Sequence, residues 1–102
     1  MNFILAIDQG TTGTTAALIN SITFEFVDKV NTEFPQIFPK PGWVEHNLDD
    51  IWNSVRNSVQ EVLSKNSVQP SQVVSIGITN QRETTCAFSR NGKPLANAIV
   101  WQ

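Results

Sequence analysis

The fold is decided by one stretch near the start of the chain, Ile4-Leu5-Ala6-Ile7-Asp8-Gln9-Gly10-Thr11-Thr12-Gly13-Thr14-Thr15. An apolar run with β-branched residues ends at Asp8, and a second apolar run follows over residues 16–19. This order predicts a strand, a tight loop and a second strand. Gly10 and Gly13 permit backbone dihedrals that other residues resist, so successive N–H groups of the loop could converge on an anion, with Thr hydroxyls as further donors.

Asp8 stands where the first strand should end. A carboxylate repels a phosphate unless a hard cation such as Mg²⁺ lies between them, so the combination is consistent with a metal-nucleotide site. The loop is not a Walker A motif, because no Lys follows the glycines and the next segment has the pattern of a strand. Taken alone, these residues fit an ordinary hairpin turn better than a nucleotide site.

Composition narrows the class of protein. The chain has 102 residues, enough for one small domain, and its 40% hydrophobic content supports a packed core. A formal charge of −2 without a basic patch gives no support to nucleic-acid binding. The single cysteine, Cys86, fits a reducing compartment, and it is expected as a packed thiol within a strand. No segment is long enough for membrane insertion, so a cytoplasmic location is expected.

The middle of the chain begins with a segment of imperfect alternation, residues 24–30, which predicts a third strand antiparallel to the second. The prolines within residues 35–41 then indicate a surface loop, which Phe38 and Trp43 are expected to pin. His46 is the one histidine, and a surface or capping role is expected for it rather than metal binding.

A helical pattern follows Asn47, which can cap the start of a helix, and Pro70 prevents the helix from continuing. Apolar residues recur along it at spacings of three and four: Leu48, Ile51, Trp52, Val55, Val59, Val62 and Leu63. This spacing predicts an amphipathic helix that packs on the sheet, with Trp52 in the core.

The last third of the chain predicts a strand and a hairpin. Residues 73–79 are almost continuously apolar, as in a strand buried on both faces, and a right-handed crossover would pair them parallel to the first strand. The loops that start at Asp8 and at Asn80 would then emerge at one edge of the sheet, where such folds bind ligands. Asn91-Gly92 predicts the turn of a hairpin that runs from Thr84 to Trp101.

Four motifs together resemble the N-terminal part of the glycerol kinase family. They are Asp8-Gln9-Gly10-Thr11-Thr12, Pro39-Lys40-Pro41-Gly42-Trp43-Val44-Glu45-His46, Gly77-Ile78-Thr79-Asn80-Gln81-Arg82-Glu83-Thr84-Thr85 and Asn97-Ala98-Ile99-Val100-Trp101-Gln102. They occur in the family's order and spacing, so the resemblance covers essentially the whole chain. The wider family of carbohydrate kinases shares the first motif, whereas the last two point to glycerol.

The resemblance implies a fold and a set of roles. The fold is the ribonuclease-H-like (actin-like ATPase) α/β domain, with a mixed sheet in the order β-β-β-α-β and a following hairpin. The roles place Asp8 at a Mg²⁺ ion, directly or through water, and they place the other motif residues at the ligands: Thr11, Thr12 and Gly13 at the phosphates of ATP, and Arg82, Glu83 and Trp101 at glycerol. Many members carry Arg where this chain has Thr15, whose hydroxyl could replace part of a phosphate contact.

The resemblance also implies that the family's catalytic base, an Asp, and its adenine pocket lie beyond residue 102. We therefore expect an incomplete domain, the N-terminal part of the first of two ribonuclease-H-like domains and about a fifth of such an enzyme, which as a whole would be a homo-oligomer. The alternatives are another carbohydrate kinase, a nucleotide-binding module of the actin or Hsp70 type, and a sheet domain with no site.

Overall fold

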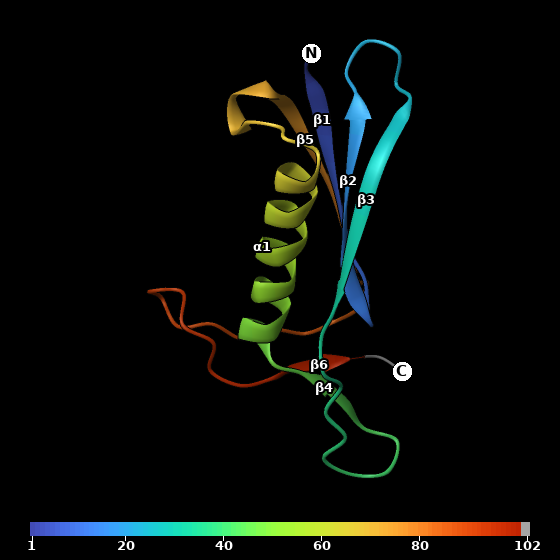
Figure 1. Ribbon diagram of the computed structural model, residues 1–102. Coiled ribbons are helices and arrows are strands. Elements are labelled where there is room, and N and C mark those ends of the chain that lie inside the picture. Colours follow the sequence, from blue (N-terminus) through green and yellow to red (C-terminus); the bar gives the residue numbers. More distant parts are fainter. Residues whose placement is uncertain (101–102) are drawn as a thin grey trace.

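A twisted four-stranded sheet carries a long helix on one face (Figure 1). The structure is a computed structural model, and it describes residues 1–100. In chain order the elements are β1 (Phe3–Gln9), β2 (Gly13–Asn20), β3 (Phe26–Glu33), β4 (Val44–His46), α1 (Leu48–Lys65), a 3-10 helix (Pro70–Gln72), β5 (Val73–Asn80) and β6 (Ala98–Val100). The large sheet has the order β3-β2-β1-β5, and β4 pairs with β6 in a separate small sheet.

The topology agrees with the sequence-based prediction. Strands β1, β2 and β3 form an antiparallel meander, and β5 lies parallel to β1 on its other side. The third strand begins at Phe26 rather than at Phe24, because Phe24 adopts a left-handed conformation (φ 59°) in the β2–β3 turn. The Asn20 side chain supports that turn by accepting hydrogen bonds from the N–H groups of Ile22 and Thr23.

The hydrophobic core lies between α1 and the large sheet. Its buried members come from the sheet, from the helix and from the segment after the helix: Phe3, Leu5, Ala16, Leu18, Val62 and Val68. Each large apolar side chain buried here stabilises the fold by about 1.5–3 kcal/mol. The helix starts as predicted, since Asn47 Oδ1 accepts hydrogen bonds from the N–H groups of Asp49 and Asp50.

The predicted core position of Trp52 is wrong, because its side chain is 60% exposed. Two small residues of the helix, Ser54 and Ser58, are buried against the sheet instead. Ser58 donates a hydrogen bond to the Thr14 carbonyl at 2.8 Å, which brings the helix close to β2. The line of contact therefore runs along the serines, and Trp52 lies beside it.

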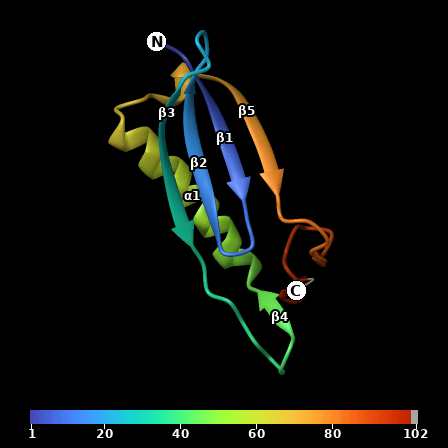
Figure 2. The same cartoon turned by 90° about the vertical axis from the view of Figure 1, so that its right-hand side faces the viewer.

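The expectation that β5 is buried on both faces is also wrong. Every residue from Val74 to Asn80 is exposed, and the exposed fraction of Ile78 is 73%. The reason is the position of α1, which packs chiefly against β2 and β3 and does not cover the edge strand β5. Figure 2 shows the opposite face of the sheet, which no element of residues 1–100 covers.

The predicted hairpin forms only in outline. Gly92 adopts a left-handed conformation (φ 84°) in its turn, but the two arms meet only at isolated bridges, Thr85 with Ile99 and Phe88 with Pro94. Pro94 lacks the N–H that a regular ladder needs, and the end of the segment pairs with β4. Cys86 is consequently exposed and outside any strand, so the expected packed thiol is wrong.

The proline loop extends away from the sheet (Figure 1). Phe38 and Trp43 do not pin it, since they are 69% and 53% exposed. The Lys40 ammonium instead lies 4.7 Å from the centroid of the Trp43 ring, as in a cation–π contact. An antiparallel β-bridge between Ile37 and Glu45 closes the base of the loop.

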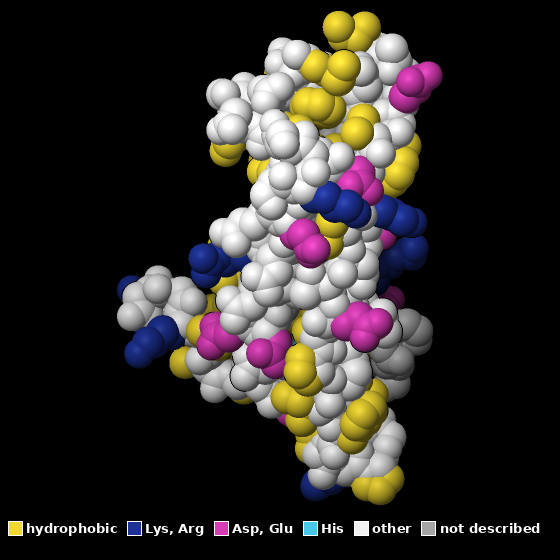
Figure 3. Space-filling model, in the orientation of Figure 1, with side chains coloured by type: hydrophobic (Ala, Val, Ile, Leu, Met, Phe, Trp, Pro, Cys, Tyr) yellow, Lys and Arg dark blue, Asp and Glu magenta, His cyan; other side chains and the backbone are white. Residues whose placement is uncertain are grey.

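Positive and negative side chains are mixed on the face of the molecule seen in Figure 3, where Lys and Arg lie among Asp and Glu. Hydrophobic side chains gather over the β2–β3 turn, where Ile22 and Phe24 are exposed. Within residues 1–100, no helix is long and apolar enough to cross a membrane.

Candidate functional site: a pocket at the ends of two parallel strands

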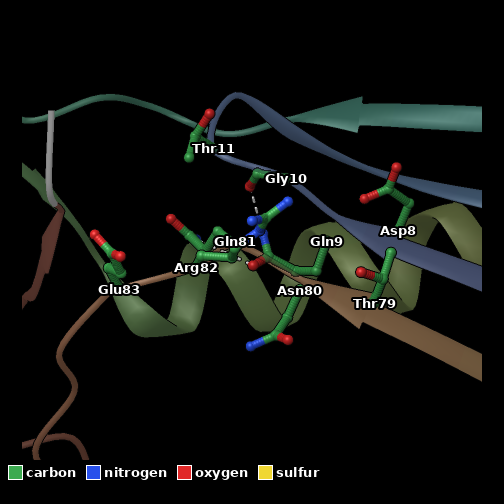
Figure 4. A pocket seen from close by; sticks show the side chains of 9 residues that line it. All are labelled: Asp8, Gln9, Gly10, Thr11, Thr79, Asn80, Gln81, Arg82 and Glu83. Carbon is green, nitrogen blue, oxygen red and sulfur yellow. Dashed lines mark hydrogen bonds between the residues drawn. The ribbon is translucent and has the colours of Figure 1, made fainter.

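An open pocket of about 570 Å³ lies where β1 and β5 end (Figure 4). The parallel register sets Asp8 beside Thr79 and Gln9 beside Asn80, so the two following loops leave the sheet together. The pocket is lined by Asp8, Gln9, Gly10, Thr11, Thr79, Asn80, Gln81, Arg82 and Glu83. The predicted meeting of the two loops at one edge is therefore confirmed.

Asp8 offers an exposed carboxylate at one end of this pocket. Its side chain lies on the sheet face opposite to the core residue Leu5, because alternate residues of a strand point to opposite faces. No hydrogen bond or ion pair within residues 1–100 engages the Asp8 carboxylate. The described residues contain no cluster of three or more His, Cys, Asp or Glu side chains. A single exposed carboxylate is a suitable ligand for a Mg²⁺ ion, which usually keeps several of its waters.

The loop after Asp8 is held by its own backbone. The Gly10 N–H donates to the Gly13 carbonyl at 2.9 Å, and the Phe34 N–H donates to the Thr12 carbonyl at 3.3 Å. Neither Gly10 nor Gly13 has a positive φ, so the left-handed conformations that glycine permits are not used at these positions. Gly13 is required for a close approach instead, because a Cβ there would lie 2.8 Å from the Thr32 carbonyl oxygen.

The threonines of the loop divide into two pairs. Thr14 is buried and its hydroxyl lies 2.6 Å from Ser54 Oγ, while Thr15 Oγ1 accepts a hydrogen bond from Asn31 Nδ2 at 2.8 Å. The hydroxyls of Thr11 and Thr12 have no such partner among residues 1–100. Of the three predicted phosphate ligands, Thr11 lines the pocket, Thr12 is exposed at the loop tip and Gly13 is buried behind it.

Arg82 and Glu83 follow β5 after one intervening residue, Gln81, and both are exposed and line the pocket. The chain leaves the strand at Asn80, as the prediction for this pair requires. Glu83 adopts a left-handed conformation (φ 55°), which is uncommon for a residue other than Gly. No ion pair joins Arg82 to Glu83 within residues 1–100. The third predicted glycerol contact, Trp101, lies outside the described residues.

His46 contradicts the expected surface or capping role. It is fully buried, its ring meets the Phe34 ring edge-on at 4.8 Å, and its two nitrogens face Gln36 and Gln81. Burial lowers the pKa of His46 below its usual value of 6.5. The glutamines around His46 were not predicted from the sequence. One signal pointed to a buried amide nearby, since alternation along β1 puts Gln9 on the same face as Phe3 and Leu5.

The large sheet and its helix follow the order β1-β2-β3-α1-β5, with a glycine-threonine loop after the first strand, while β4 belongs to the separate small sheet. This arrangement defines a class of protein, the ribonuclease-H-like fold of actin-type ATPases. Residues 3–102 match the family described as "FGGY family of carbohydrate kinases, N-terminal domain", and the chain belongs to this family.

Known proteins agree with this assignment. The chain is 54% identical to glycerol kinases of Geobacillus sp. (strain WCH70) and Thermus thermophilus over 98% of its length, and it spans 20% of theirs. The crystal structure of Plasmodium falciparum glycerol kinase with ADP superposes with a TM-score of 0.86 at 40% identity, over 99% of this chain and 20% of that one. A xylulose kinase of Lactobacillus acidophilus reaches a TM-score of 0.88 at 24% identity, over 99% of this chain and 20% of that one, which indicates a shared fold. The resemblance to glycerol kinase is confirmed.

Proposed function

We propose that residues 1–102 form the N-terminal part of the first ribonuclease-H-like domain of a two-domain, ATP-dependent glycerol kinase. The reaction transfers the γ-phosphoryl group of ATP to a primary hydroxyl of glycerol and gives sn-glycerol 3-phosphate. The observation that carries the proposal is the pocket, which combines an uncharged glycine-threonine loop with the charged pair Arg82 and Glu83. The 54% identity to glycerol kinases supports glycerol over other acceptors.

The phosphate side of the site consists of Asp8 and the loop after it. Bound Mg²⁺ would neutralise charge on the phosphate oxygens, and the exposed Asp8 carboxylate would hold the ion directly or through water. The hydroxyls of Thr11 and Thr12 and the backbone at Gly13 would bind the phosphates. Phosphoryl transfer depends mainly on positioning and charge neutralisation, so a rigid loop of neutral donors suits it.

The acceptor side consists of Arg82 and Glu83, with Trp101 against the carbon face of glycerol. A guanidinium donates hydrogen bonds and a carboxylate accepts them, so the pair matches the hydroxyls of a small polyol. Because the two side chains are not paired with each other in the described chain, both remain available for a ligand.

The same proposal includes a cytoplasmic location and a homo-oligomeric enzyme. ATP as substrate and a free Cys86 thiol support the location. The homo-oligomer follows from the family resemblance.

A substrate panel tests the proposal. The full-length protein is incubated with Mg-ATP and with glycerol, a pentulose, a hexulose or no acceptor, and ADP release and the phosphorylated product are measured. We expect turnover with glycerol to exceed the others, and preference for a ketose or acceptor-independent hydrolysis would overturn the assignment. The 102-residue chain alone is expected to give no turnover, because it spans 20% of the length of these relatives.

A further inference from the structure

A chain of hydrogen-bonded side chains connects the two loops of the pocket. We call it the amide network, and its members are Gln9, Gln36, His46, Gln81 and Thr84. We propose that His46 is a positioning residue, which acts through Gln36 and Gln81 to hold the loop of residues 10–12 with the N–H groups of Thr11 and Thr12 unpaired and pointing away from the network. The inference rests on the proposed nucleotide-binding function and adds to it a residue that lies outside the pocket.

The first arm of the network runs from the end of β5 to Gly10. Gln81 Nε2 donates to Gln9 Oε1 at 3.0 Å, and Gln9 Nε2 donates to the Gly10 carbonyl at 2.8 Å (Figure 4). Thr84 Oγ1 donates to Gln81 Oε1 at 3.0 Å, so the Gln81 amide presents its NH₂ group to Gln9. This arm connects the segment that carries Arg82 to the Gly10 carbonyl, the first carbonyl of the loop of residues 10–12.

The second arm runs through His46 to Thr11. Gln36 Nε2 donates to the Thr11 carbonyl at 2.9 Å, so Gln36 presents its Oε1 to His46 Nε2, which lies 2.7 Å away. His46 must therefore carry its proton on Nε2. Its Nδ1 is then an acceptor, and Gln81 Nε2 lies 3.5 Å from it, at the outer limit of a hydrogen bond. The two arms meet at Gln81 and end on successive carbonyls of one loop.

This arrangement fixes the direction of two N–H groups. The peptides of residues 1–100 are all trans, and in a trans peptide the C=O and the N–H point in opposite directions. Because the Gly10 and Thr11 carbonyls are bound by the network, the N–H groups of Thr11 and Thr12 point away from it. The Gly10 N–H is already bound to the Gly13 carbonyl. The network thus leaves two adjacent N–H groups free to bind an anion.

Burial makes His46 suitable for this task. The side chain is 0% exposed, and burial lowers its pKa, so the imidazole is neutral at pH 7. A neutral imidazole donates through one nitrogen and accepts through the other, which is what Gln36 and Gln81 require.

Substitutions in the full-length protein test the proposal. His46→Leu removes both contacts, and we expect kcat/KM for ATP to fall about tenfold or more, since small displacements of binding groups cost rate steeply. His46→Gln keeps a donor for Gln36 and should recover most of the loss. Val62→Ala, a core change in α1 far along the helix from this network, controls for lost stability and should leave kcat/KM for ATP unchanged in the folded protein.

A double-mutant cycle separates positioning from general damage. Gln36→Leu breaks the second arm at a less buried residue, so it tests the same arm if His46→Leu fails to fold. If His46 acts through Gln36, the double variant should lose no more than the worse single variant. Losses that multiply, or a His46→Leu enzyme with the wild-type kcat/KM for ATP, would overturn the proposal.

The affinity for Mg-ATP in the absence of an acceptor, measured by calorimetry for the wild-type protein and for His46→Leu, distinguishes the network proposal from the glycerol kinase proposal. If the wild-type protein fails to phosphorylate glycerol but binds Mg-ATP more tightly than His46→Leu does, the glycerol assignment is wrong and the network proposal is supported. If glycerol is phosphorylated and both proteins bind Mg-ATP equally, the network proposal is wrong and the glycerol assignment is unaffected.

Discussion

The two loops that border the pocket differ in what they present to a ligand. The loop of residues 10–12 carries no charge, and its carbonyls are bound by neighbouring side chains and backbone. The segment of Arg82 and Glu83 presents two exposed charged side chains, and Glu83 has a left-handed backbone. The first loop contributes fixed backbone groups, and the second contributes side chains that can adjust.

This difference matches the two kinds of ligand in the proposed reaction. A phosphate group is the same in every nucleotide, so fixed donors can bind it without loss of conformational entropy. A small polyol is recognised by its pattern of hydroxyls, which side chains of opposite charge can distinguish. We therefore expect substitutions at the first loop to affect catalysis or folding, and substitutions at the second to affect the choice of acceptor.

The largest effect is expected at Asp8, which precedes the fixed loop. In the full-length protein, Asp8→Asn should lower kcat by about two orders of magnitude, because the lost charge serves the metal and the charge that develops on the phosphates. The KM for glycerol should change little. Glu61→Gln, an exposed carboxylate on α1 outside the pocket, is the control in steady-state assays. Unchanged kcat of Asp8→Asn at saturating Mg²⁺ would remove this residue from the mechanism.

A pair of glycines tests how closely β2 packs on β3 directly after the first loop. Gly13→Ala would force a Cβ to within 2.8 Å of the Thr32 carbonyl oxygen, and such overpacking should lower the free energy of unfolding by about 1–3 kcal/mol. Gly77→Ala is the matched control, because a Cβ on this glycine of β5 meets nothing within 4 Å. Urea unfolding of the chain measures both. Equal effects at the two positions would mean that the backbone of β2 and β3 shifts to accept the extra atom.

The predictions that the structure confirms depend on local rules. The strand-loop-strand order around Asp8, the Asn47 cap and the parallel pairing of β5 follow from alternation, capping and crossover handedness. Together these rules were enough to predict that the two loops of the pocket lie side by side.

The predictions that failed concern contacts between distant parts of the chain. An apolar run shows that a strand can be buried, but only the position of α1 decides that β5 is not. Similarly, the burial of His46 depends on Gln36 and Gln81, which lie 10 and 35 positions away. Alternation along β1 signals that Gln9 is buried, but no local pattern specifies that Gln36 and Gln81 meet one imidazole, so the amide network as a whole was not predictable.

The second loop is tested by its two charged residues. In the full-length protein, Arg82→Ala and Glu83→Ala should each lower kcat/KM for glycerol about tenfold, because a charge-assisted hydrogen bond contributes about 1.5–3 kcal/mol. The KM for ATP should change little in either variant. Arg90→Ala, an exposed arginine outside the pocket, should leave both parameters unchanged. Wild-type kinetics in both Ala variants would mean that the pair does not bind the acceptor, as expected for ordinary surface charges.

The smallest effect concerns His46, which links the two loops, and it appears as a dependence of stability on pH. Burial lowers the pKa of His46 in the folded chain below 6.5, so the unfolded chain takes up a proton first as the pH falls. The free energy of unfolding should therefore decrease as the pH falls below about 6.5, with a slope of at most about 1.4 kcal/mol per pH unit for one proton. Urea unfolding of the chain at several pH values measures this slope.

Two comparisons assign the slope to His46. Asp28, whose pKa is lowered from 3.8 chiefly by a hydrogen bond from Asn66, stabilises the fold above that pH and loses its contribution as the pH falls through its folded pKa. Its window therefore lies well below that of His46. His46→Gln cannot titrate, and because His46 is the one histidine of the chain, this variant should lose the decrease that begins near pH 6.5. If His46→Gln keeps the wild-type slope between pH 6.5 and pH 5, another group is responsible, and the imidazole does not need to be neutral to join the two loops.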